Sequence, residues 1–326
     1  MVNHFRDEIQ RPIMGVGHSM GGFHLTALAL LHPRLFSTLV LVDPVLQRAP
    51  RPGGNYFPGK MSAKRRDRWP SREAATVAFK KSKFYQTWDP RVLDCWVQHG
   101  LRELPTKLYP EATPASQTPP TISADPSGAT VPPEKNTERE VTLTTTKHQE
   151  VLTFMRANFT TADYPNPETE SNPFTHPDID LETDYGTPFY RPEPLAVFRR
   201  LPHLRPSVLY VFGSESNLSA PDQIEDKMKM TGVGVGGSGG VKKGRVKEYT
   251  AQGAGHLIPM ERVGETAEQC SLWMGQEYER WVDEEKRIKT MREAIPREKR
   301  SQMTDKFMEI VRGDFMAAIK ERKSKL

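Results

Sequence analysis

The segment from Gly17 to Gly21, Gly-His-Ser-Met-Gly, constrains this chain more than any other stretch. It follows a short apolar run, Ile13 to Val16, and precedes apolar residues at helical spacing, which places it at a turn between a strand and a helix. A serine on such a sharp turn points away from the sheet, and small neighbours let the chain pass closely on either side. We therefore predict that Ser19 is a nucleophile, that Gly17 and Gly21 supply the room, and that the Met20 N–H stabilises an oxyanion.

The strands and helices around this turn alternate. A second apolar strand, Leu39–Val42, follows the first helix, and this strand–helix–strand order is typical of parallel pairing. Two more strands, Ser207–Phe212 and Arg245–Tyr249, flank a helix that begins at Pro221 and ends at Met230. The chain is therefore predicted to be an α/β protein with a mostly parallel sheet and flanking helices.

The Gly-His-Ser-Met-Gly-Gly motif resembles the α/β-hydrolase superfamily, in which lipases and esterases commonly carry it. Together with residues 39–44, residues 71–104 and a terminal Ser-Lys-Leu, it more narrowly resembles a fungal peroxisomal group that includes yeast peroxisomal lipase and AK-toxin-type host-selective toxin biosynthesis hydrolases. The superfamily resemblance covers roughly residues 1–50 and 205–260. It implies an α/β-hydrolase fold that is N-terminally incomplete, because complete members have several strands before the nucleophile. The second oxyanion donor, which those strands usually supply, is left unassigned.

The resemblance also implies a position for the general base. The loop Gly253-Ala-Gly-His256 follows the last predicted strand, where this superfamily carries its catalytic histidine. Glycines on both sides let the imidazole of His256 reach across to Ser19. By contrast, His18 and His24 flank the nucleophile in sequence and are expected to pack locally.

The third member of a triad is less well defined. Relatives often carry an acid three residues after the glycine that ends the penultimate strand, but that position here is Ser216, which cannot stabilise an imidazolium. Asp43, at the end of the strand after the nucleophile, is the favoured substitute. Glu215 and Asp222 are alternatives, as is a site with no acid. An Asp-Pro pair also ends strands without any chemical role.

The composition of the chain divides it into four parts. Residues 1–50 and 205–295 are predicted to form the hydrolase core, and residues 51–204 a large helical lid insertion. The predicted lid helices cover 71–82, 90–104 and 147–158, and aromatic residues in this region either line a pocket or form ordinary core. A Pro- and Thr-rich stretch at about 105–140 is predicted to be disordered. The glycine-rich stretch 232–240 is predicted to be a flexible linker or a lid hinge, and 296–326 a charged helical tail with a helix over 299–323.

Other classes of protein fit the sequence poorly. The net charge of +5 comes without a nucleic-acid-binding motif, and no apolar run is long enough for a transmembrane segment. The 2 cysteines cannot form a disulfide framework. Three aspartates within 178–184 lack the glycine and glutamate of a calcium loop. We predict no metal and no organic cofactor.

The last three residues, Ser324, Lys325 and Leu326, match the peroxisomal targeting signal that an import receptor binds. We therefore expect a serine hydrolase of the peroxisomal matrix that cleaves an ester or thioester of an apolar, small-molecule acyl compound. The resemblance adds fungal toxin biosynthesis as a setting. The rival hypothesis is a catalytically inactive, truncated α/β-hydrolase that acts as a binding partner, and a strand-bearing exon upstream of Met1 would count against it.

Overall fold

The structure is a computed structural model, and it describes residues 4–5, 7–48, 56–110, 139–157, 189–313 and 315–324. It consists of two compact units, Met1–Leu272 and Trp273–Leu326. Most of the predicted disordered stretch and the three aspartates within 178–184 lie outside the described residues.

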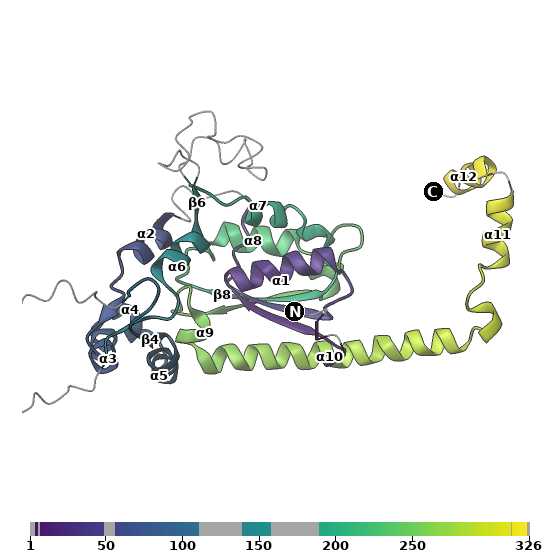
Figure 1. Cartoon of the computed structure of the whole chain (residues 1–326). Helices are drawn as coiled ribbons and strands as arrows, with labels where there is room; N and C mark the ends of the chain where they lie inside the picture. Colours follow the sequence, from purple (N-terminus) through teal and green to yellow (C-terminus); the bar gives the residue numbers. More distant parts are fainter. Residues whose placement is uncertain are drawn as a thin grey trace, which may run out of the picture. The chain divides into compact units, whose positions relative to one another are not determined.

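A four-stranded parallel sheet forms the centre of the first unit (Figure 1). Its strands, in spatial order, are β1 (Met14–His18), β2 (Thr38–Val42), β8 (Ser207–Gly213) and β9 (Val246–Ala251). Each strand pairs in parallel with the next, so all four carboxyl ends lie at one edge of the sheet. The predicted parallel α/β core is confirmed, and each strand lies within one or two residues of its predicted bounds.

Helices α1 (Met20–Leu31), α7 (Glu193–Phe198) and α8 (Pro221–Met230) cover one face of this sheet (Figure 1). Alternate residues of β2 and β8 point to this face, as the period of two in a strand requires. They join the helices in one apolar core, which includes Phe23, Leu30, Leu39, Leu41, Val197, Phe198, Val208, Tyr210 and Phe212. This core fixes α1 on β1 and β2 and thereby fixes the turn that carries Ser19.

A mixed region is inserted between β2 and β8. Its elements are α2 (Tyr56–Lys64), β3 (Arg68–Trp69), α3 (Arg72–Lys81), α4 (Lys83–Gln86), α5 (Pro90–His99), β4 (Leu101–Glu103), β5 (Val141–Leu143), α6 (Lys147–Phe154), β6 (Arg156–Ala157) and β7 (Phe189–Tyr190). Strands β3, β5 and β4 form a small antiparallel sheet with its own core. Tyr85 and Trp96 pack against that core, so these two aromatic residues belong to it.

Two predicted helices of the inserted region end early. The helix predicted to run to residue 104 ends at His99, because the next residues pair with β5 as strand β4. The helix predicted to run to residue 158 ends at Phe154, because Arg156 and Ala157 pair with β7. By contrast, α3 matches its prediction, with the Ser71 side chain accepting a hydrogen bond from the Ala74 N–H.

The glycine-rich stretch 232–240 is not a free linker. Its backbone donates to the 3-10 turn Leu201–His203 and its neighbour: Gly232 N–H to Leu201 O (2.9 Å), Gly234 N–H to Pro202 O (2.7 Å) and Ser238 N–H to Leu204 O (2.9 Å). The prediction of a flexible linker was wrong because glycines also permit close backbone packing.

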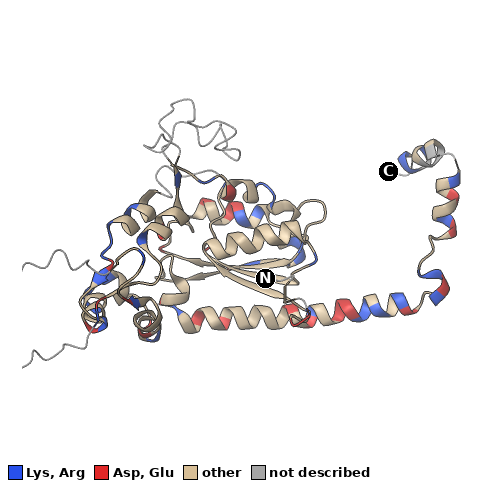
Figure 2. Cartoon of the chain, in the orientation of Figure 1, with Lys and Arg blue, Asp and Glu red and all other residues tan. Residues whose placement is uncertain are grey.

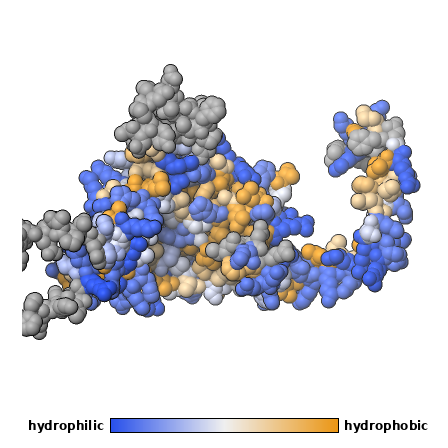
Figure 3. All heavy atoms as spheres, in the orientation of Figure 1, coloured by the Kyte–Doolittle hydropathy of each residue, from blue (hydrophilic) through white to orange (hydrophobic). Residues whose placement is uncertain are grey.

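The remaining helices are α9 (Ile258–Glu261), α10 (Val263–Glu293), α11 (Asp305–Arg312) and α12 (Phe315–Lys323). The helix predicted over 299–323 is in fact two helices, and α11 ends at the cap residue Gly313. Charged residues of both signs crowd the second half of α10 and the tail helices (Figure 2). Hydrophobic residues lie among the hydrophilic ones at the surface of the tail helices (Figure 3), and they include the exposed Phe307, Ile310, Val311 and Met316. Within the described residues, no helix is both long and apolar enough to cross a bilayer.

The turn between β1 and α1 leaves no space at Gly17. A Cβ added there would lie 2.6 Å from the Gly21 carbonyl carbon and 2.7 Å from the Gly22 N, and neither backbone atom can move aside. A Cβ at Gly22 would lie 2.9 Å from Pro44 Cβ, whereas one at Gly21 would meet open space. The close approach therefore requires Gly17 and Gly22, and the prediction that Gly21 supplies room was wrong.

We expect Gly17→Ala to lower the free energy of unfolding by about 3 kcal/mol, because the added methyl collides with backbone. Gly21→Ala is the matched control. It should leave that free energy unchanged or raise it by up to about 1 kcal/mol, since alanine is the better helix former. Urea unfolding followed by circular dichroism measures both variants, and equal stabilities of the two would contradict the packing described here.

Candidate active site

Four loops meet at the carboxyl edge of the parallel sheet. They follow β1 at Ser19, β2 at Asp43, β8 at Ser214 and β9 at Gln252. Residues far apart in sequence become neighbours because parallel strands present their carboxyl ends on the same side. Binding sites in open α/β sheets commonly lie at this edge.

Ser19 occupies a strained backbone conformation, with φ 54° and ψ −118°. A non-glycine residue at positive φ costs free energy, and the surrounding structure must hold it there. Three backbone hydrogen bonds do so: the Ser19 N–H donates to Val42 O (2.9 Å), and the N–H groups of Val45 and Phe23 donate to Ser19 O (3.2 and 3.3 Å). The next residue, Met20, begins α1, so its N–H has no acceptor within the helix and is available to an oxyanion.

His256 lies between Ser19 and Asp43. Its Nε2 is 2.9 Å from Ser19 Oγ, and its Nδ1 is 2.6 Å from Asp43 Oδ2. The tautomer that carries hydrogen on Nδ1 donates to the carboxylate and leaves Nε2 free to accept the serine proton. The side chain of His256 is 32% exposed, whereas that of Asp43 is fully buried. The structure therefore brings together Ser19, His256 and Asp43 in one hydrogen-bonded chain.

Asp43 also has a positive φ, 41°, and its N–H donates to Val211 O at 2.8 Å. Its carboxylate accepts hydrogen bonds from His256 and from the hydroxyls of Ser216 and Ser219. The two alternative acids lie elsewhere: Glu215 is exposed, and Asp222 lies in the first turn of α8. The acid that contacts the imidazole thus comes from β2.

His18 connects the nucleophile turn to the histidine loop. Its Nε2 lies 2.8 Å from His256 O, and the two rings are 4.8 Å apart. Burial lowers the pKa of His18, which favours a neutral ring that donates to this carbonyl. The other flanking histidine, His24, is exposed and lies against Phe23. The expectation of local packing therefore describes His24, while His18 makes a contact across 238 positions.

Sequence reasoning missed the contribution of Ser216 and Ser219. The sequence marks Ser216 only as an unsuitable position for the acid, and Ser219 lies in no motif. The one available signal was the spacing of Ser216 from Gly213, which places it where an acid would point toward the histidine.

A model of the alpha/beta hydrolase fold family matches residues 9–263, which is most of the chain. This chain belongs to the α/β-hydrolase family. It is 41% identical over 298 residues to the type I acyl-CoA thioesterase mpaH' of Penicillium brevicompactum, a match that covers 90% of this chain and 65% of that protein. The chain thus spans less than two thirds of the length of that relative.

Two further proteins are similar to this chain. It is 26% identical over 266 residues to the abhydrolase domain-containing protein AFT2-1 of Alternaria alternata, covering 82% of this chain and 84% of that protein. The crystal structure of the peroxisomal α/β-hydrolase Lpx1 from Saccharomyces cerevisiae is 14% identical, with a TM-score of 0.48, and the match covers 99% of this chain and 66% of that chain.

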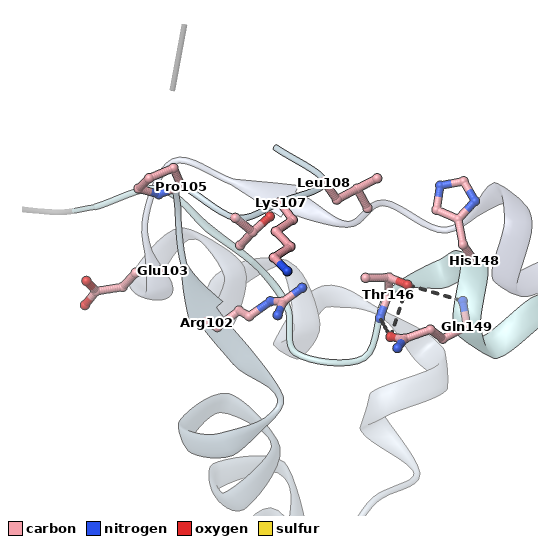
Figure 4. Close-up of a pocket in the computed structure, with 9 residues that line it drawn as sticks. Arg102, Glu103, Pro105, Lys107, Leu108, Thr146, His148 and Gln149 are labelled. Atoms are coloured by element: carbon pink, nitrogen blue, oxygen red, sulfur yellow. Dashed lines mark hydrogen bonds between the residues drawn. The ribbon is translucent and has the colours of Figure 1, made fainter. Parts of the chain in front are cut away.

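A separate concavity of about 650 Å³ lies in the inserted region (Figure 4). It is lined by Arg102, Glu103, Pro105, Thr106, Lys107, Leu108, Thr146, His148 and Gln149, and therefore by no member of the hydrogen-bonded chain. The side chains of Arg102 and Lys107 point toward the same space, while Glu103 points away (Figure 4). Because these side chains are exposed, the concavity is open to solvent, and we assign no chemistry to it.

Replacement of Asp43 by asparagine keeps the shape of the side chain but favours the wrong histidine tautomer. We expect Asp43→Asn to lower kcat by about 10⁴-fold with little change in KM. Glu215→Gln is the matched control and should leave kcat within about twofold of the parent. Steady-state kinetics on a hydrolysed ester or thioester measures both, and a fully active Asp43→Asn enzyme would remove Asp43 from the triad.

Proposed function

We propose that this chain carries a serine hydrolase site that cleaves acyl-CoA thioesters. The observation that carries the proposal is the hydrogen-bonded chain from Ser19 through His256 to Asp43. The choice of thioester is supported by the 41% identity to a type I acyl-CoA thioesterase. The sequence alone leaves esters and thioesters equally open.

The proposed reaction begins when Ser19 Oγ attacks the thioester carbonyl while His256 Nε2 takes the serine proton. Negative charge then develops on the carbonyl oxygen, and the Met20 N–H donates to it. The tetrahedral intermediate collapses, the carbon–sulfur bond breaks, and His256 gives its proton to the departing thiolate. A water molecule then attacks the acyl-serine by the same route and releases a carboxylic acid.

We further propose that the inserted region acts as a lid over the acyl chain. Its helices α2 and α6 expose several large apolar side chains, which suit an apolar acyl compound: Tyr56, Phe57, Met61 and Leu152. A role in fungal secondary-metabolite biosynthesis, including host-selective toxins, rests on the sequence resemblance alone and is part of the proposal.

Turnover of an acyl-CoA panel with increasing chain length tests the proposed function. We expect the parent protein to release free thiol catalytically, and Ser19→Ala to lower the rate by at least about 10⁴-fold, because the attacking oxygen is lost. A thiol reagent measures the release. The exposed Cys95 reacts with the same reagent, so the assay uses Cys95→Ser protein or counts only turnover beyond one equivalent.

A fluorophosphonate probe tests whether Ser19 is the nucleophile without any assumption about the substrate. Labelling of the parent and not of Ser19→Ala supports a serine nucleophile independently of any acyl group. Labelling that persists in Ser19→Ala, or absent labelling of the parent, would contradict the proposal and favour a non-catalytic binding role. Labelling together with hydrolysis of simple esters but not of acyl-CoA would keep the nucleophile and exclude the thioester.

Delivery to the peroxisomal matrix is a separate proposal. It is supported by the sequence Ser324-Lys325-Leu326, of which the last two residues lie outside the described part of the chain. A fluorescent protein fused in front of residues 297–326 should enter peroxisomes in fungal cells. The same fusion without the final leucine should stay in the cytosol, because the import receptor binds the complete tripeptide. Equal distribution of the two fusions would contradict the proposal.

A further inference from the structure

The carboxylate of Asp43 is an ionisable group with no exposure to solvent. A buried carboxylate is costly unless hydrogen bonds replace the water it has lost. Within the described part of the chain, three side chains donate to it: His256 Nδ1 and Ser216 Oγ to Oδ2, and Ser219 Oγ to Oδ1. Both oxygens are therefore held, and the plane of the carboxylate is fixed relative to the imidazole.

The two serines belong to one short turn after β8. The Ser216 N–H donates to Gly213 O (3.0 Å), and the Ser219 N–H donates to Ser216 O (3.1 Å). The Leu218 N–H donates to Ser216 Oγ (3.1 Å), so this hydroxyl oxygen is already an acceptor and directs its own proton to Asp43. Both serine side chains are thus orientated by the turn itself.

A buried lysine of α8 donates a hydrogen bond to the backbone of this turn. Lys227, in α8, is fully buried, and its Nζ donates to Leu218 O at 3.1 Å. The same Nζ lies 5.6 Å from the centre of the Phe212 ring, in the strand that leads into the turn. The positions of the two hydroxyls therefore follow from the packing of α8 on β8.

We propose that Ser216 and Ser219 are positioning residues for the proposed hydrolase: their hydroxyls hold the Asp43 carboxylate in place and aim it at His256. This inference rests on the proposed function for its effect on turnover. Ser216 and Ser219 are 8% and 6% exposed, so neither side chain is available to substrate. Their effect on the reaction passes through Asp43 and His256.

The sign of the effect on pH dependence follows from the hydrogen bonds. Donors to a carboxylate favour its charged form, so the loss of a donor favours proton binding by a carboxylate and the imidazole paired with it. Within the described residues, four other titratable groups lie beside this pair or beside the serine turn. His18 from β1 and Glu261 from α9 contact the His256 loop. Lys227 from α8 donates to Leu218 O, and the exposed Glu215 adjoins Ser216. All four remain in the serine variants, so a change in the acidic limb of the pH–rate profile reports the lost hydroxyls.

Kinetics of Ser216→Ala, Ser219→Ala and the double variant test the proposal. We expect kcat to fall about tenfold in each single variant and further in the double variant, with KM nearly unchanged, since each lost hydrogen bond is to a charged group. The acidic limb of the profile should move to higher pH. Ser207→Ala is the control, because this buried hydroxyl donates to Thr38 Oγ1 (2.8 Å) at the opposite end of β8. It should alter thermal stability without moving the acidic limb.

An exchange of acid and hydroxyl tests the geometry more directly. Ser216 Oγ and His256 Nδ1 contact the same oxygen of Asp43, so a longer acidic side chain at position 216 reaches toward the space that this oxygen leaves. The double variant Asp43→Ser/Ser216→Asp should be at least about tenfold more active than Asp43→Ser alone. A double variant no more active than the single one would overturn the shared-oxygen geometry.

The low-field proton NMR signal of the His256 Nδ1–H separates this proposal from the proposed function, because it requires no turnover. We expect the signal to shift in Ser216→Ala and in Ser219→Ala but not in Ser207→Ala. A parent protein without labelling or turnover but with these shifts would reject the hydrolase and keep the positioning role. If the double variant Ser216→Ala/Ser219→Ala folds and shows an unchanged signal and an unchanged pH profile, the positioning role is rejected. If Ser216→Ala does not fold, Ser219→Ala alone decides, by the same criteria.

Discussion

The parallel pairing of four strands is the constraint on which the rest of the structure depends. It places the ends of β1, β2, β8 and β9 at one edge, and it makes neighbours of residues that are up to 238 positions apart. A shift of one residue in any of these registers would turn the side chains at the strand ends to the other face of the sheet. The apolar core under α1, α7 and α8 prevents such a shift, because alternate residues of β2 and β8 are buried in it. The chemistry at the edge is therefore held in place by hydrophobic packing on the face.

Within this frame, the nucleophile and the acid form a rigid pair. They follow adjacent strands, and the hydrogen bond from the Ser19 N–H to Val42 O joins the two turns directly. Both residues have positive φ, a conformation that costs free energy unless the surroundings enforce it. The acid would be less closely tied to the nucleophile if it came from the end of β8, because β2 separates β8 from β1. Because the acid comes from β2, the residue at position 216 does not have to supply it. The Ser216 hydroxyl instead donates a hydrogen bond to the carboxylate of Asp43.

Much of the core and the main members of the site could be predicted from the sequence. Ser19 and His256 follow from glycine-flanked turns after strands, and Asp43 follows from its place at a strand end. The missed features depend on tertiary contacts. Nothing in the sequence shows that Lys227 is buried, because lysine in a short amphipathic helix is usually exposed. Likewise, Leu101 continues a helical pattern, and only its pairing with β5 makes it a strand.

The histidine loop is restrained from two sides, which its glycines alone would not suggest. On one side, the His18 ring lies against His256 O. On the other, Glu261 in α9 accepts a hydrogen bond from the Gly255 N–H at 2.8 Å. The inserted region also contacts α9, since the Asp89 N–H donates to Met260 O at 2.8 Å.

The contact from Asp89 gives the inserted region a physical connection to the base. Asp89 caps α5 by accepting a hydrogen bond from the Arg91 N–H, so the residue that touches α9 is fixed at a helix end. Displacement of α5 would therefore act on Met260, four residues after His256, and through the short helix α9 on the loop that carries the imidazole. Ser19 and Asp43 would not move with it, because their strands belong to the central core. His256 is thus the one member of the hydrogen-bonded chain whose position depends on both the central sheet and the inserted region.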